Sequence, residues 1–196
     1  KIFSNIVAYS SFKGLATNVK GAVANYLMGE FQMLIEAGAG EFYGFKDYAW
    51  AHTKLFGNTG VKGEFAELLT NNINHKSVLM RELFDPLQEN FSQKSHTKYY
   101  TSMFRQLVSH DCSFIGYSSG EYLIHYVNMY ALLHNQKVLL NCKKISLYDA
   151  FEVKDKQDGN SELHLKTGVT DLDGNVITDD FIDKIRKKLR YVNQST

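Results

Sequence analysis

Residues 120–137 read GEYLIHYVNMYALLHNQK, with apolar side chains recurring at three- and four-residue steps. This spacing puts them on one side of a helix and predicts a helix over the whole stretch. Residues 111–119 are expected to be a break before it. Ser118 or Ser119 is expected to cap its first turn, because a serine side chain accepts a hydrogen bond from a backbone N–H group there, and Glu121 suits the positive end of the helix dipole.

Residues 15–37 predict a second long helix, which Gly38 and Gly40 are expected to end. Gly21 and Gly29 lie inside it, each at a cost of about 1 kcal/mol against alanine. The small residues Gly21, Ala24 and Gly29 predict a helix-packing surface, because they let another helix approach closely.

Four shorter helical patterns lie between these two, and another ends the chain. They cover residues 46–56, 61–73, 76–84 and 99–108, with Asp85-Pro86 as a further helix start or a plain turn. The last pattern starts at Thr178 or Asp179 and runs through Phe181, Ile182, Ile185, Leu189 and Val192.

Two extended runs, residues 145–153 and 162–166, flank Asp158-Gly159-Asn160 and predict a β-hairpin. The fold class is therefore mainly α: an irregular helical assembly with one small β-hairpin insert near residues 145–167. We divide the chain into a helical region (1–144), a hairpin and turn insert (145–178) and a terminal helix (179–196). We expect this helix to continue past Thr196 in a longer protein, of which the given sequence would be a fragment. The start at Lys1, without methionine, and the uncapped end both favour a fragment.

The composition is that of an ordinary globular domain. The chain has 196 residues, 44% of them apolar, and a formal charge of +1, so it carries no strong overall field for steering nucleic acid. Cys112 and Cys142 lie far apart, and we expect two reduced, buried thiols. The longest uncharged stretch, residues 122–136, is shorter than the ~20 apolar residues of a membrane span.

Metal chemistry has one weak candidate pair. Glu121 and His125 stand four positions apart, so they share one side of a helix. A usable site needs three or four ligands, which His110, Asp111 and Cys112 could complete from the preceding segment. We interpret the pair as a helix acid and a packed histidine, and predict no metal and no cofactor.

Other chemical signals are weaker still. One segment has acids close to a glycine but not the spacing of a calcium loop: Asp171, Asp173, Gly174 and Asn175. This pattern predicts an Asp-Gly turn. No nucleophile-elbow or phosphate-loop motif is present in the sequence. A non-enzymatic role is therefore favoured, although seven histidines leave an arrangement in space open.

The final helical pattern is rich in basic residues, which are candidate nucleic-acid contacts: Lys184, Arg186, Lys187, Lys188 and Arg190. A solvated face is the more common reason for such a run. Acids open this helix and bases close it, as the helix dipole favours.

Four segments resemble a region of the very long virion proteins of crAss-like, short-tailed bacteriophages. They are residues 14–25; 34–38 with 45–49; 120–124 with 129–134 and 145–151; and 173–175 with 184–186 and 191–194. The resemblance covers most of the chain and includes no catalytic motif.

The resemblance implies a structural virion protein, made in the host cytoplasm, packaged in the head or associated with the tail, and in part carried into the host with the genome. Its implied partners are other virion proteins and the rest of its own long chain, with DNA as a further candidate. Two alternatives stay open: a helical metal-dependent hydrolase using Glu121 and His125, and a membrane-active ejection segment in which residues 15–37 insert into a bilayer.

Overall fold

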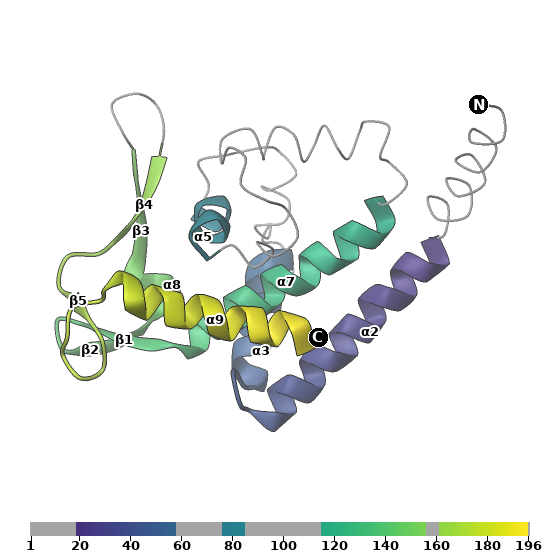
Figure 1. Ribbon diagram of the computed structural model, residues 1–196, viewed down its shortest axis with the longest axis horizontal. Coiled ribbons are helices and arrows are strands. Elements are labelled where there is room, and N and C mark those ends of the chain that lie inside the picture. The colour runs from purple at the N-terminus through teal and green to yellow at the C-terminus, as the bar shows by residue number, and fades with distance from the viewer. Residues whose placement is uncertain (1–18, 58–75, 85–114, 156–160, 196) are drawn as a thin grey trace.

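A computed structural model describes residues 19–57, 76–84, 115–155 and 161–195 (Figure 1). Of its interpretable residues, 63% are helical, and a small antiparallel sheet accompanies the helices, which confirms the mainly-α prediction. The helix patterns predicted at 61–73 and 99–108, the start at Asp85-Pro86 and the Cys112 thiol lie outside the described residues.

Helix α7 (Ile115–Asn135) is the centre of the described fold. Helices α2 (Val19–Ala39), α3 (Phe45–Phe56) and α9 (Asp179–Ser195) all pack against it. Figure 1 shows α2 and α7 running side by side, with α9 crossing in front. Residues 123–133 of α7 are buried or half-buried, because neighbours cover this helix on several sides.

The boundaries of α7 differ from the prediction at both ends. It begins at Ile115, so the expected break is wrong over residues 115–119, and residues 111–114 lie outside the described residues. The expected cap at Ser118 or Ser119 is also wrong, and Glu121 lies beyond the first turn. Serine and glycine are weak helix formers, but extending an existing helix is far easier than nucleating one. It ends at Asn135, before the strand that begins at Lys137.

Helices α3, α5 and α9 follow their sequence signals closely, whereas α2 continues through Gly38, which was expected to end it, to Ala39. Helix α3 ends at Gly57, whose φ of 83° is a conformation that glycine adopts without strain. Helix α5 (Lys76–Phe84) matches its predicted range. In α9 the predicted apolar positions Ile182, Ile185, Leu189 and Val192 are buried, so the three- and four-residue spacing correctly identified its inner side.

The β structure is more elaborate than one hairpin. Strands β1 (Lys137–Leu140) and β2 (Lys143–Ser146) pair antiparallel, and β5 (Val169–Thr170) joins the other edge of β1. Strands β3 (Phe151–Asp155) and β4 (Ser161–Leu165) form a separate antiparallel pair, which is the predicted hairpin. The prediction missed β1, because its four residues continue the apolar pattern of α7.

The run predicted as extended over 145–153 is interrupted by a helical turn, α8 (Leu147–Ala150). Ser146 caps this turn: its Oγ accepts a hydrogen bond from the Asp149 N–H at 3.1 Å and donates one to the Asp149 carboxylate at 2.6 Å. A serine three residues before an acid is a known signature of a helix start. The sequence therefore carried the signal that corrects our strand prediction.

Cys142 is exposed, so the prediction of a buried thiol is wrong at this position. It lies with Asn141 in the two-residue turn between β1 and β2, and both residues have positive φ (51° and 63°). Two consecutive positive φ values are typical of the tight turns that suit twisted hairpins. The turn projects Cys142 into solvent because it lies at the tip of the hairpin.

One hydrophobic core unites the described elements. It includes Met33 of α2, Leu55 of α3, Tyr130 of α7, Phe151 of β3 and Leu189 of α9. All three of the predicted regions, 1–144, 145–178 and 179–196, contribute residues to this core.

Candidate functional site

Helix α2 has two apolar sides, and only one of them packs against the described chain. Gly29, Met33 and Ala37 are buried on the inner side. The opposite side, which we call the outer face of α2, consists of exposed residues: Val23, Ala24, Leu27, Met28, Phe31, Leu34, Ile35 and Gly38. The large apolar side chains of this face are 39–63% exposed.

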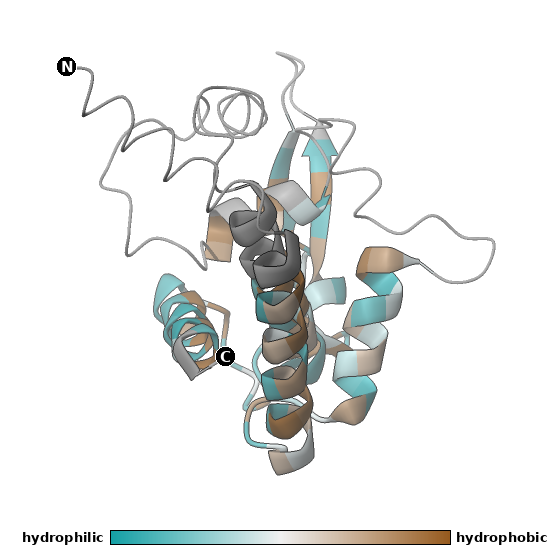
Figure 2. Ribbon diagram, turned by 90° about the vertical axis from the view of Figure 1, so that its right-hand side faces the viewer, coloured by the Kyte–Doolittle hydropathy of each residue, from teal (hydrophilic) through white to brown (hydrophobic). Residues whose placement is uncertain are grey.

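The apolar side of a helix normally packs against a neighbour. Figure 2 shows the contrast: α2, at the centre of the view, carries hydrophobic residues over much of its length, whereas α9, beside the label C, is mostly hydrophilic. Phe45, at the start of α3, lengthens the outer face: its Cζ lies 3.5 Å from where a Cβ atom of Gly38 would be, and the residue is 58% exposed. The outer face is the strongest candidate for an interaction surface.

The inner side of α2 is fixed by a close contact with α7. A Cβ atom added to Gly29 would lie 2.0 Å from Cδ1 and 2.8 Å from Cγ1 of Ile124. Glycine therefore leaves the space that the Ile124 side chain occupies. Ala24 instead lies on the outer face, and Gly21 falls in the helical turn whose surroundings are not described.

A polar cluster fixes α2 against α3. Glu30 lies on the inner half of α2, and its Oε2 accepts a hydrogen bond from the Tyr48 hydroxyl at 2.5 Å. The same oxygen lies 3.2 Å from Nε2 of His52. Burial alone would raise the pKa of Glu30, but hydrogen bonds from His52, Tyr26 and Tyr48 outweigh it, so the pKa is lowered.

This cluster makes the stability of the α2–α3 packing depend on pH. Because the pKa of Glu30 is lower in the folded than in the unfolded chain, ionisation of Glu30 stabilises the fold above the ordinary carboxyl pKa. That stabilisation disappears as the pH falls through the folded pKa. We expect Glu30→Gln to reduce the unfolding free energy by about 2 kcal/mol at pH 7, the scale of lost hydrogen bonds to a charge.

The measurement is urea unfolding of both proteins between pH 7 and pH 3. The difference between wild type and Glu30→Gln should shrink as the pH falls below the ordinary carboxyl range. Glu162→Gln is the matched control, because its carboxylate pairs with His164 at the surface. A difference that stays constant over the whole pH range would contradict the role of Glu30.

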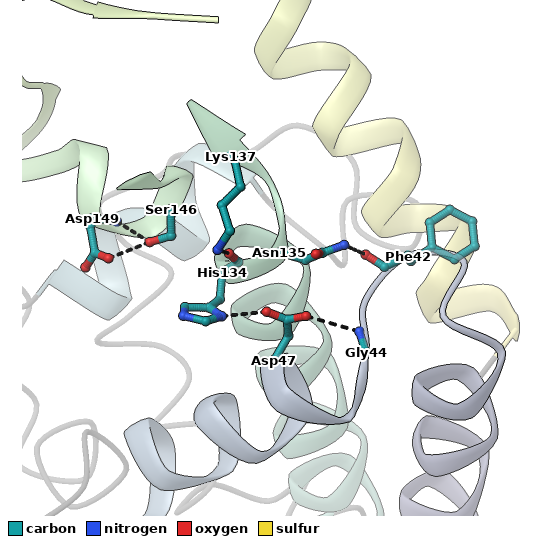
Figure 3. Close-up of polar contacts among 8 residues, drawn as sticks. All are labelled: Phe42, Gly44, Asp47, His134, Asn135, Lys137, Ser146 and Asp149. Atoms are coloured by element: carbon teal, nitrogen blue, oxygen red, sulfur yellow. Dashed lines mark hydrogen bonds and ion pairs between the residues drawn. The ribbon is translucent and has the colours of Figure 1, made fainter. Parts of the chain in front are cut away.

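A second polar pair joins α3 to the end of α7 (Figure 3). Nδ1 of His134 lies 2.6 Å from Oδ1 of Asp47, and the other Asp47 oxygen accepts the Gly44 N–H at 3.1 Å. The His134 ring stacks on Trp50 with a centroid separation of 4.2 Å. Such a pair orients a histidine, but no serine, threonine or cysteine of the described residues is hydrogen-bonded to His134, so we assign the pair to packing.

The sequence pointed to neither polar cluster. Both join residues of different helices: Glu30 to Tyr48 and His52, and Asp47 to His134. The available signal was weak, namely an acid standing within the apolar run of α2.

The proposed metal pair is only partly described. His125 is half-buried on α7, and the side chain of Glu121 lies outside the described residues. Among the residues that the structure describes, no group of three or more histidine, cysteine, aspartate or glutamate side chains is placed to hold a metal ion. The ligands expected to complete the site, His110, Asp111 and Cys112, are not described either.

The basic residues of α9 do not form one surface. Lys184, Lys187 and Lys188 are exposed, whereas Arg186 and Arg190 are half-buried. Arg186 donates from Nε to the Leu83 carbonyl oxygen of α5 at 2.7 Å and pairs with Asp183, also at 2.7 Å. Arg186 therefore helps to hold α9 against α5.

The Asp171 segment has the turn that was predicted for it. The Asp171 carboxylate accepts hydrogen bonds from the backbone N–H groups of Asp173 and Asn175 and from the Asn175 side chain. These bonds lower the pKa of Asp171, the side-chain bond from Asn175 most of all. The Asp171 carboxylate thus stabilises the turn through hydrogen bonds within residues 171–175.

No family model, curated protein or solved structure matches this chain. Within the described residues, no helix is both long and apolar enough to cross a membrane.

Proposed function

We propose that this chain works by protein–protein packing, as a structural segment of a larger assembly. The observation that carries the proposal is the outer face of α2: an apolar surface on a helix whose other side is already packed. Soluble monomers seldom expose contiguous apolar surface of several hundred Å², and such patches mark interaction sites.

The assembly that we propose is a phage virion, with the chain packaged in the head or associated with the tail and delivered in part with the genome. This step rests on the resemblance of four segments to very long virion proteins. The outer face supports the packing role, because a large exposed apolar surface marks an interaction site.

The hydrolase and membrane alternatives have less support. A hydrolase based on Glu121 and His125 needs further ligands, and the described residues contain no group of three or more histidine, cysteine, aspartate or glutamate side chains placed to hold a metal ion. A membrane-active role would use the same outer face. The experiments below must therefore distinguish binding to a protein from binding to a lipid bilayer. For DNA, the exposed lysines of α9 share that helix with the exposed acids Asp180 and Asp183, which weakens their attraction for phosphate.

Mass spectrometry of purified particles tests the virion proposal. We expect peptides of this chain in gradient-purified particles of the phage that encodes it. A Leu27→Glu/Phe31→Glu protein should accumulate in infected cells but be lost from particles at least tenfold, because carboxylates would replace the centre of the apolar face.

The matched control is Val176→Glu, which changes an apolar residue that is 75% exposed outside α2. It should enter particles like the wild type. Wild-type chain that is abundant in the cell but absent from particles would contradict the virion proposal.

A further inference from the structure

We infer that the outer face of α2 binds the same face of a second copy of this chain, with the two helices antiparallel and Phe31 at the two-fold axis. This inference rests on the proposed packing function and names the partner. Three properties of the face support it: its lack of charge, its spacing and its area.

The outer face carries no charged side chain that could pair with a charged partner. Its eight residues are all apolar or small, from Val23 to Gly38. Glu30 lies in the middle of the same helix, but it is turned inward to Tyr48 and His52. A partner must therefore bring an apolar surface of its own, and an identical face does so.

The spacing of the face is symmetric about Phe31. Its members stand at positions 24, 27, 28, 31, 34, 35 and 38, with Val23 beside them, and the intervals 3, 1, 3, 3, 1 and 3 read the same in both directions. A two-fold interface requires a surface that complements itself in this way. Two antiparallel copies would pair Leu27 with Ile35, Met28 with Leu34, and Phe31 with Phe31.

The ends of the face follow the same symmetry. Ala24 would lie opposite Gly38, so that a small residue stands at each end of the pair. The Phe45 ring lies beside Gly38, with Cζ 3.5 Å from where a Cβ atom of residue 38 would be, and would form part of the contact at that end. Antiparallel helices also place opposite ends of their dipoles together. This arrangement gives Ala24, which is exposed in the single chain, the helix-packing role that the sequence predicted for it.

The area is sufficient for a specific dimer. Six large side chains, five aliphatic and one aromatic and each about half exposed, present at most roughly 600 Å² of apolar surface per copy if each is given the ~200 Å² of an aromatic side chain. If contact covered all of this surface, two copies would bury about 1,200 Å², the lower limit of specific protein interfaces. We therefore expect a reversible dimer.

Sedimentation velocity of the full chain over a concentration series tests the inference. The wild type should change from monomer to dimer as concentration rises. Phe31→Glu should raise the dimer dissociation constant at least about 100-fold, because it brings two carboxylates together in an apolar contact. Val176→Glu should dimerise like the wild type, and circular dichroism should show that both variants keep their helices.

Disulfide crosslinking tests the helix direction, with Cys112→Ser and Cys142→Ser as background. Leu27→Cys mixed with Ile35→Cys should form an interchain disulfide, whereas either protein alone should not. Crosslinking of each protein with itself would show parallel helices and overturn the inference. A wild type that stays monomeric over the series would also overturn it, whether or not it binds lipid vesicles.

The two proposals can fail separately. A chain that is monomeric in solution but present in particles contradicts self-association alone. A chain that dimerises through Phe31 but is absent from particles contradicts the virion proposal alone.

Discussion

Replacing Asn128 by leucine should lower the free energy of unfolding by about 3 kcal/mol, the range expected when a buried polar partner is lost. Asn128 is fully buried in α7. Its Oδ1 accepts a hydrogen bond from the Tyr43 hydroxyl at 2.7 Å, and its Nδ2 donates to Asn193 Oδ1 at 3.0 Å. Leucine has a similar size but would leave the buried Tyr43 hydroxyl without its acceptor.

Urea unfolding followed by circular dichroism measures this effect as a lower midpoint at an unchanged slope. The control is the double variant Tyr43→Phe/Asn128→Leu, which removes both partners. Its loss of stability should be smaller than the sum of the two single losses by at least ~1 kcal/mol. Strict additivity would show that the Tyr43–Asn128 bond contributes nothing.

Replacing Gly29 by leucine should destabilise the fold by about 3 kcal/mol, the upper range for overpacking a core. Even the Cβ atom would lie 2.0 Å from Cδ1 of Ile124, which is itself buried. Leucine is the better helix former by about 1 kcal/mol, but the steric cost exceeds this gain because either the buried Ile124 side chain or α2 itself must shift. Ala49→Leu, on the exposed side of α3, should change stability by less than ~0.5 kcal/mol.

A compensating change in α7 tests the mechanism. Ile124→Ala alone should cost about 2–5 kcal/mol, because it leaves a cavity beside Gly29. Combined with Gly29→Leu, it should give a protein at least as stable as Gly29→Leu alone, since the new side chain fills that space. A double variant less stable than both single variants would contradict the contact between Gly29 and Ile124.

Local signals were enough where one residue type determines local geometry. Gly57 ends α3 at the predicted position, and the apolar spacing of α9 identified its buried side. The same reasoning failed at Ser146, where a capping hydroxyl starts a helical turn inside a run that resembles a strand. It failed again at Cys142, because the tight turn between β1 and β2 depends on the pairing of the two strands.

The helix that carries the outer face was predictable from the sequence, but the exposed side of that helix was not. The spacing of apolar residues predicted a long helix over 15–37, and its small residues predicted a packing position at Gly29. It could not tell which side of that helix packs inward, because α2 is apolar on both sides and periodicity needs a polar side for contrast. The structure decided it through Ile124 and Tyr48, which lie on other helices.

The sequence by itself determined where the longer described helices of this chain lie and, in α3, where one ends, but not the helical turn α8. Those features depend on neighbours within one or two turns: the apolar spacing of α9, or Gly57 after α3. Only the tertiary structure decided that Asn128 accepts a hydrogen bond from Tyr43, 85 positions away, and that the outer face of α2 is exposed. Burial is a property of what packs against a residue, and those neighbours are set by the path of the whole chain.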